Sequence, residues 1–136
     1  MKTFPIFLTL HQRPALVVGR SSMAVAKARL LHEAGSDVTA ITGLAEPTHV
    51  AFDDGVHVID RPFQDSDLTG IALVYCATDD AEADARVSAA AQHANIPVNV
   101  VDRPDLSTFI TPAIVDRDPL TIAISTSGTA PVLARQ

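Results

Sequence analysis

The chain has 136 residues, of which 47% are hydrophobic and 19% are charged, and its formal net charge at pH 7 is −6. This length and composition predict one compact globular domain, and the acidic balance argues against binding to nucleic acid or to a membrane surface. The single cysteine, Cys76, excludes an intrachain disulfide and fits a reducing, cytoplasmic location. The apolar N-terminal run lacks a cleavage site for a signal peptide and is too short to cross a membrane.

The N-terminal part of the chain predicts an extended segment, a strand and a helix. Residues 4–8 are expected to form an edge strand or an extended arm, since Pro5 cannot donate to a strand ladder. Residues 15–18 are apolar throughout, which is typical of a strand buried on both faces. The helix that follows is expected to have Ser22 as its N-cap and to stop at Gly35. Its predicted buried stripe is Met23, Ala26, Leu30 and Ala34, widened by Ala24, Ala28 and Leu31.

This strand, turn and helix have the pattern of the first unit of a dinucleotide-binding fold, in which a pyrophosphate binds at the helix N-terminus. The pattern requires glycine, glycine and then glycine or alanine, and here the three positions hold Gly19, Ser21 and Ala24. A glycine in the middle lets the backbone approach the pyrophosphate, so the side chain of Ser21 is expected to weaken binding. The residues predicted to contact the cofactor are Gly19, Arg20, Ser21, Ser22, Met23, Thr42, Gly43 and Thr78.

Strands and helices continue to alternate along the chain. A second long helix is expected to begin in a capping box formed by Asp79 and Glu82 and to stop at Asn95. Its predicted buried stripe is Ala83, Val87, Ala90 and Ala94. The alternation predicts an α/β, Rossmann-like doubly wound fold with a mostly parallel sheet and helices on both faces. Further strands are predicted at residues 37–41, 56–59, 71–77, 97–101 and 120–124, and a helical turn at 65–68.

Residues 1–136 are therefore predicted to be a single NAD-binding domain. A last helix is expected to begin near Pro131, and a helix of one turn is marginal unless it packs on something. The segment from about 114 to 136 is expected to lead into a dimerisation segment that is truncated here. A homodimer is predicted on this basis.

Ligands of an open parallel sheet bind beyond the carboxyl ends of its strands. Asp102 is either a loop carboxylate that caps local amides or a functional group in this cleft, close to Asn99 and Arg103. The hydroxyl-rich turn 125–129 is either an ordinary turn or a nest of amides and hydroxyls for an anion. The features predicted to lie at this edge are the Gly19 turn, Thr42–Gly43, Asp102 and the turn 125–129.

No metal site is predicted, because the five histidines lack the spacing of metal ligands. Cys76 lies inside an apolar strand and is expected to be buried and inert. The acids at the start of the second helix are expected to complement its dipole; they are Asp79, Asp80, Glu82 and Asp84.

Short motifs run along the chain at residues 4–8, 16–19, 27–31, 33–35, 77–80, 99–102, 109–110, 112–117, 127–129 and 131–135. In this order they resemble the N-terminal domain of siroheme synthase, the family of precorrin-2 dehydrogenases and sirohydrochlorin ferrochelatases. Members of that family normally carry three consecutive glycines where this chain has Gly19-Arg20-Ser21. They also continue into a helical dimerisation domain.

The resemblance implies NAD-dependent oxidation of the tetrapyrrole precorrin-2 to sirohydrochlorin, with ferrous iron as a possible substrate of a second step. It also implies that Asp102 is the acid/base residue, a role that suits a carboxylate at a strand end. The substrate carries eight carboxylates, for which Arg20, Arg103 and Arg117 are candidates by position. The predicted substrate-binding residues are Asn99, Arg103, Arg117, Ser125, Thr126, Ser127 and Gly128.

Two other functions stay open at this point. The chain is also compatible with a regulatory module that senses NAD or NADH without chemistry. It is compatible as well with a degenerate relative that binds a tetrapyrrole or a metal without NAD.

Overall fold

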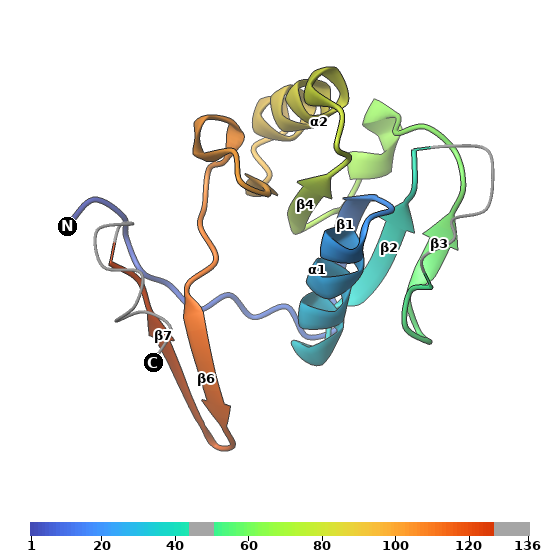
Figure 1. Ribbon diagram of the computed structural model, residues 1–136. Coiled ribbons are helices and arrows are strands. Elements are labelled where there is room, and N and C mark those ends of the chain that lie inside the picture. The colour runs from blue at the N-terminus through green and yellow to red at the C-terminus, as the bar shows by residue number, and fades with distance from the viewer. Residues whose placement is uncertain (44–50, 127–136) are drawn as a thin grey trace. The chain divides into compact units, whose positions relative to one another are not determined.

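The computed structural model describes residues 1–43 and 51–126 (Figure 1). The chain divides into two compact units: Thr9–Phe109 forms one, and Met1–Leu8 together with the segment from Ile110 onward forms the other. The first and larger unit holds every helix of the described chain. A single NAD-binding domain over residues 1–136 stays a prediction.

The larger unit is built on a five-stranded parallel sheet with strand order β3-β2-β1-β4-β5. This order and the parallel pairing confirm the Rossmann-like α/β fold. Each predicted strand of this sheet is present, with small differences at the ends. The strands are β1 (Pro14–Gly19), β2 (Asp37–Ile41), β3 (His57–Ile59), β4 (Leu73–Ala77) and β5 (Val98–Val100).

Two helices, α1 (Ser22–Glu33) and α2 (Ala81–His93), cover opposite faces of this sheet (Figure 1). Side chains alternate along β1, so that Ala15 and Val17 pack in the same core cluster as α1. Leu16 and Val18 point to the other face and pack in the cluster that includes α2. All four are at most 1% exposed, which explains why this strand is apolar throughout.

The predicted buried stripes of both helices are partly wrong. In α1 the buried residues are Ala24, Val25, Ala28 and Leu31, whereas Met23 is 43% exposed. Ala24, Ala28 and Leu31, expected only to widen the buried stripe, thus form the buried face together with Val25. In α2 the buried residues are Asp84, Val87, Ser88 and Ala91, of which only Val87 was predicted.

The helix ends follow the expected turn chemistry, with a shift of one residue at each start. Gly35 and Asn95 have positive φ angles of 83° and 58°, which confirms them as the left-handed residues that stop α1 and α2. The N-cap of α1 is Ser21 rather than Ser22. The N-cap of α2 is Asp80 rather than Asp79, because Asp80 Oδ1 accepts hydrogen bonds from the amides of Glu82 and Ala83.

The smaller unit contains an antiparallel hairpin of β6 (Ala113–Arg117) and β7 (Leu120–Ile124). The predicted strand at 120–124 is therefore present, but it belongs to a separate two-stranded sheet. Residues 4–8 form no strand, so the edge-strand alternative is wrong. The helix expected near Pro131 lies outside the described residues.

Two short 3-10 helices complete the larger unit. The predicted helical turn is confirmed as η1 (Asp65–Leu68), and η2 (Pro104–Leu106) follows β5. Within the described ranges, no helix combines the length and apolar character needed to cross a bilayer.

Candidate functional site

The carboxyl ends of β2, β1, β4 and β5 lie next to one another along one edge of the parallel sheet, which we call the carboxyl edge. The backbone leaves these four strands at Thr42, Arg20, Thr78 and Val101, respectively. Three of the four features that the sequence predicted for this edge are found there. The fourth is the turn 125–129: Ser125 and Thr126 follow β7, which pairs with β6 and is not a strand of the parallel sheet, and residues 127–129 lie outside the described residues.

Gly19 ends β1 in a backbone conformation that other residues rarely adopt, with a φ angle of +138°. A Cβ atom added here would collide with the carbonyl oxygen of Ala77 and lie 3.4 Å from the Cβ of Ala24. Ala24 itself is completely buried. Gly19 thus permits the close approach of β4, and the small side chain of Ala24 permits the close approach of α1. These are the structural roles of the first and third positions in the dinucleotide-binding pattern.

The middle position, Ser21, caps α1. Its Oγ atom accepts a hydrogen bond from the Ala24 amide at 3.3 Å. The first turn of a helix presents amides that have no intrahelical acceptor, and an anion is stabilised there by the helix dipole. The first turn of α1 contains no acidic residue, and its residues Ser22 and Met23 are exposed. The N-terminus of α1 therefore remains suited to a pyrophosphate, although the Ala24 amide already donates to the hydroxyl of Ser21.

Thr42 and Gly43 extend the pairing of β2 with the chain beyond β3. The Thr42 amide donates to the Ile59 carbonyl, and the Gly43 amide donates to the Arg61 carbonyl, both at 3.0 Å. The hydroxyl of Thr42 donates to Oδ1 of Asp60 at 2.9 Å. Thr42 is only 3% exposed, so this predicted cofactor residue is a buried part of the carboxyl edge.

At the end of β4, Thr78 is held by the buried carboxylate of Asp84. Oδ1 of Asp84 accepts hydrogen bonds from the amide and the hydroxyl of Thr78, at 3.1 and 2.6 Å. It also accepts from the thiol of Cys76 at 3.3 Å. Asp84 comes from the first turn of α2, so this network ties the helix to the loop that carries Thr78 and Asp79.

Cys76 is completely buried, as the sequence predicted. Burial raises the pKa of its thiol, and the neighbouring carboxylate of Asp84 raises this pKa further. A cysteine in this state stays protonated at neutral pH and is a poor nucleophile.

Asp102 follows β5 in a tight turn that is closed by a hydrogen bond from the Arg103 amide to the Val100 carbonyl, at 3.0 Å. Its φ angle is +63°, a conformation that aspartate and asparagine tolerate better than most residues. The side chain is exposed and has neither a hydrogen bond nor an ion pair with any residue that the structure describes. Of the two sequence-based alternatives, capping of local amides therefore finds no support in the geometry.

Two predicted neighbours of Asp102 are engaged in structural contacts. The side-chain nitrogen Nδ2 of Asn99 donates to the Phe109 carbonyl at 2.9 Å. Asn99 pairs with Tyr75 in the sheet, so the two side chains lie on the same face. Arg103 forms two hydrogen bonds with the carboxylate of Asp105, at 3.1 and 2.9 Å. This partner raises the pKa of the guanidinium, and Asp105 is itself exposed at the surface.

The remaining predicted substrate residues are not part of the larger unit. Arg117 lies on the hairpin, where it donates to the Asp116 carbonyl at 2.9 Å, and Ser125 and Thr126 follow β7. Ser127 and Gly128 lie outside the described residues.

Sequence reasoning missed two carboxylates at the carboxyl edge. The sequence pattern predicts Asp84 only as one of several helix-end acids, although Val87, Ser88 and Ala91 follow it after three, four and seven residues and share its helix face. Asp60 gave no local signal, because its partner Thr42 is distant in the sequence.

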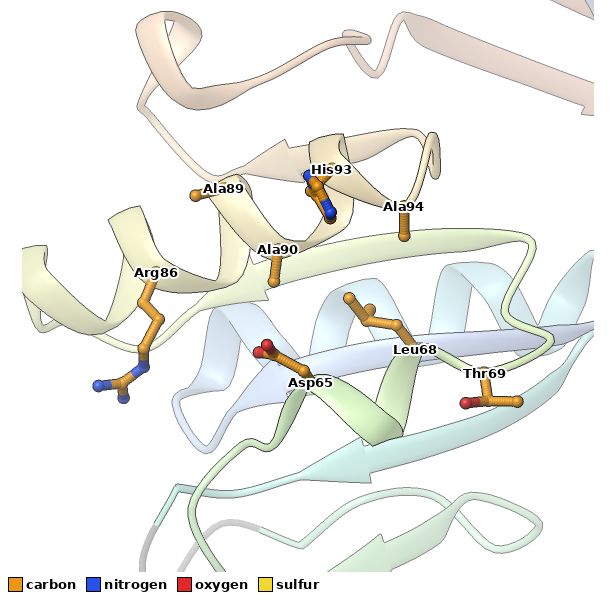
Figure 2. Close-up of a pocket in the computed structure, with 8 residues that line it drawn as sticks. All are labelled: Asp65, Leu68, Thr69, Arg86, Ala89, Ala90, His93 and Ala94. Atoms are coloured by element: carbon orange, nitrogen blue, oxygen red, sulfur yellow. The ribbon is translucent and has the colours of Figure 1, made fainter.

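A shallow hollow of about 600 Å³ lies elsewhere, between η1 and the later turns of α2 (Figure 2). Leu68 and the alanines of α2 form its apolar lining, and Asp65, Arg86 and His93 stand around it. None of the predicted site residues contributes to this hollow. Among the described residues, no group of three or more potential metal-ligating side chains is arranged around a common point.

Comparison with known families places the chain in a family. Residues 6–113 match a family model described as NAD(P)-binding. The chain belongs to this NAD(P)-binding family. Residues 117–136 match a second model, described as the central part of the sirohaem biosynthesis protein. The family match therefore supports the expected use of an NAD(P) cofactor.

The chain is also similar to siroheme synthases over almost its whole length, as the sequence motifs predicted. It is 50% identical to the siroheme synthase of Methylobacillus flagellatus and 46% identical to that of Methylococcus capsulatus, over 99% and 100% of this chain. In both cases the chain spans only 29% of the relative's length. A solved precorrin-2 dehydrogenase, SirC, shares the fold with a TM-score of 0.74 and 23% identity, over 97% of this chain and 65% of that protein.

Proposed function

We propose that this chain is the NAD-dependent precorrin-2 dehydrogenase part of a siroheme synthase, which oxidises precorrin-2 to sirohydrochlorin. The observation that carries the proposal is the free carboxylate of Asp102 at the same sheet edge as the Gly19 turn. The similarity of the chain to a siroheme synthase, 50% identity over 99% of its length, also supports the proposal.

The Gly19 turn and the first turn of α1 fit the pyrophosphate of the cofactor. A side chain at position 19 has no room, and the amides around Ser22 and Met23 lie at a helix N-terminus without acidic neighbours. When bound, NAD supplies the hydride acceptor for the oxidation. Of the two nicotinamide cofactors we propose NAD rather than NADP.

Asp102 is proposed as the acid/base residue. Oxidation of precorrin-2 removes a hydride and a proton from the macrocycle, and the proton needs an acceptor near the reacting carbon. Asp102 is exposed and makes no hydrogen bond with a described residue, so its carboxylate can take that proton without breaking a contact. The same group is a candidate acceptor for pyrrole protons if ferrous iron is a second substrate.

The carboxylates of the tetrapyrrole require cationic and hydroxyl partners. Arg103 is a candidate that would exchange its surface contact with Asp105 for a substrate carboxylate. Arg117 of the hairpin and the residues after it, Ser125, Thr126, Ser127 and Gly128, remain proposed substrate contacts.

A homodimer is proposed to cover the smaller unit. Most of the large apolar side chains exposed in the described chain belong to this unit; they are Met1, Phe4, Ile6, Phe7, Leu8, Ile110, Ile114, Leu120 and Ile122. Apolar surface of this extent is typical of an interface. Sedimentation should show a dimer or reversible self-association, and a clean monomer at high concentration would contradict the proposal.

The function is tested by titrating the purified chain with NAD and then supplying precorrin-2 while NADH absorbance is followed. NADH formation with appearance of sirohydrochlorin is the expected result. NAD binding without turnover would favour the regulatory module, and tetrapyrrole binding without NAD would favour the degenerate relative. A cytoplasmic location stays a prediction.

A further inference from the structure

The second strand of many NAD-binding units is followed by an acid that binds the ribose hydroxyls of the adenosine. This chain has Ile41, Thr42 and Gly43 at that point and therefore lacks the acid in its sequence. The fold nevertheless brings a carboxylate to the end of β2 from the neighbouring strand. The hydroxyl of Thr42 donates to Oδ1 of Asp60, the residue that follows β3, at 2.9 Å.

This contact is set by the strand pairing. Ile41 of β2 is in register with Ile59 of β3, and the amides of Thr42 and Gly43 continue the ladder to the carbonyls of Ile59 and Arg61. Thr42 and Asp60 are thus the next neighbouring pair beyond the two strands. A one-residue shift of β3 would remove the carboxylate from this edge.

The alternation of side chains predicts that Thr42 and Asp60 lie on the face of the sheet covered by α1. Ile41 and Ile59 pack in the core cluster on the α2 face. If the alternation continues past the strand ends, Thr42 and Asp60 face the side covered by α1, and their hydrogen bond shows that the two side chains lie together. The N-terminus of α1, where the pyrophosphate is proposed to bind, lies on this same side at the end of the adjacent strand β1.

Asp60 has the remaining acceptor capacity that a ribose requires. It is half-buried, and Thr42 is its only side-chain partner among the residues that the structure describes. A carboxylate offers about four acceptor positions on two oxygens, so one oxygen can stay on Thr42 while the other accepts from a hydroxyl. We propose, resting on the function proposed above, that Asp60 binds the hydroxyls of the adenosine ribose and selects NAD over NADP.

Arg61, the cation next to Asp60, is not placed to favour NADP over NAD. NADP-binding sites commonly use an arginine to hold the 2′-phosphate. Here Arg61 forms two hydrogen bonds with the Asp67 carboxylate, at 2.9 and 2.6 Å, and Asp67 raises the pKa of the guanidinium. A 2′-phosphate would therefore meet the charge of Asp60 while the guanidinium of Arg61 is committed to another carboxylate.

The inference is tested by titrating the 136-residue chain with NAD and with NADP in a calorimeter. Asp60→Asn keeps the size of the side chain but removes its charge. We expect the affinity for NAD to fall roughly tenfold and the affinity for NADP to stay or rise, since a hydrogen bond to a charged acceptor is stronger than one to an amide. Asp65→Asn is the matched control, because it removes one charge from an exposed position on η1 and should leave both affinities unchanged.

Thr42→Val provides a second, independent variant. It removes the hydroxyl that orients Asp60 and leaves the charge, so the preference for NAD should fall by less than in Asp60→Asn. Circular dichroism checks that each variant folds, and if one does not, the other decides. An unchanged ratio of NAD to NADP affinity in the folded variants would overturn the role of Asp60 alone. Failure of the unmodified chain to bind either nucleotide would overturn the proposed function, and the role of Asp60 with it.

Discussion

Oδ1 of Asp84 lies 2.6 Å from the hydroxyl oxygen of Thr78 and 3.1 Å from its amide nitrogen, so one buried oxygen atom holds the start of the β4–α2 loop. We expect Asp84→Ala to lower the free energy of unfolding by about 2–3 kcal/mol, because three donors, the amide and hydroxyl of Thr78 and the thiol of Cys76, lose their acceptor. Asp84→Asn should cost less, since its amide oxygen can still accept. Urea denaturation measures both, and Glu82→Ala, in the same helical turn but exposed, is the control. Equal effects of Asp84→Ala and Glu82→Ala would contradict this role.

Gly19 and Gly43 offer a matched pair at the carboxyl edge. Both have positive φ angles, of 138° and 92°, but a Cβ at Gly43 meets no atom of the described residues within 4 Å, whereas one at Gly19 collides with Ala77. Gly43→Ala should therefore cost about 1–2 kcal/mol of backbone strain. Gly19→Ala should cost distinctly more or prevent folding. Thermal melting of the two variants tests this, and similar melting temperatures would contradict the close approach of β1 and β4.

Two variants of Ser21 distinguish its role in capping α1 from crowding of the cofactor by its side chain. Ser21→Ala removes the hydroxyl that accepts from the Ala24 amide and should cost about 1 kcal/mol of stability, whereas Ser21→Gly should cost only a few tenths. If the Cβ atom crowds the pyrophosphate, only Ser21→Gly should bind NAD more tightly than the unmodified chain. Calorimetric titration of the three proteins distinguishes the cases. Equal NAD affinity in all of them would show that neither the hydroxyl nor the Cβ weakens binding.

Asp102→Asn should abolish precorrin-2 oxidation while leaving folding and NAD affinity nearly unchanged. Asparagine tolerates the left-handed backbone at this position but cannot take a proton. Asp79→Asn is the control, because Asp79 is also exposed at the carboxyl edge with a φ angle of 62°. Turnover and melting temperature are measured on both variants. An active Asp102→Asn with lowered stability would assign Asp102 a structural role instead.

The Arg61–Asp67 pair predicts part of the acid sensitivity of the fold. The hydrogen bond from Arg61 holds the pKa of the Asp67 carboxyl below its ordinary value, and this side chain is only 8% exposed. The unfolded chain therefore binds this proton more readily than the folded one. The stabilisation is complete above the unfolded pKa of about 4 and is lost as the pH falls through the lowered folded value.

We accordingly expect Asp67→Asn to lose less stability than the unmodified chain between neutral pH and about pH 2. Urea denaturation at a series of pH values measures the difference. Asp65 is an exposed acid on the same short helix, so Asp65→Asn should leave the loss of unfolding free energy at low pH almost unchanged. Parallel stability curves for the unmodified chain and Asp67→Asn would contradict the prediction.

The sequence by itself determined most strands and helices in their order along the chain and the place of the Gly19 turn, Thr42 and Asp102 at the ends of parallel strands. These features depend on local physics: apolar runs form buried strands, and residues such as Gly35 and Asn95 stop helices because they tolerate a positive φ angle. The same holds for Gly19, whose need for a tight turn is visible in the spacing to Ala24.

Only the tertiary structure decided which helix faces are buried and which carboxylates reach the carboxyl edge. Asp84 and Ser88 lie on the buried face of α2 because Thr78 and the Leu106 carbonyl satisfy their polar atoms, and these partners are invisible to a hydrophobic pattern. The pairing of β6 with β7 outside the parallel sheet, and the meeting of Asp60 with Thr42, also depend on contacts between distant segments. The free energy of such contacts comes from burial and hydrogen bonding across the fold, so local sequence does not encode them.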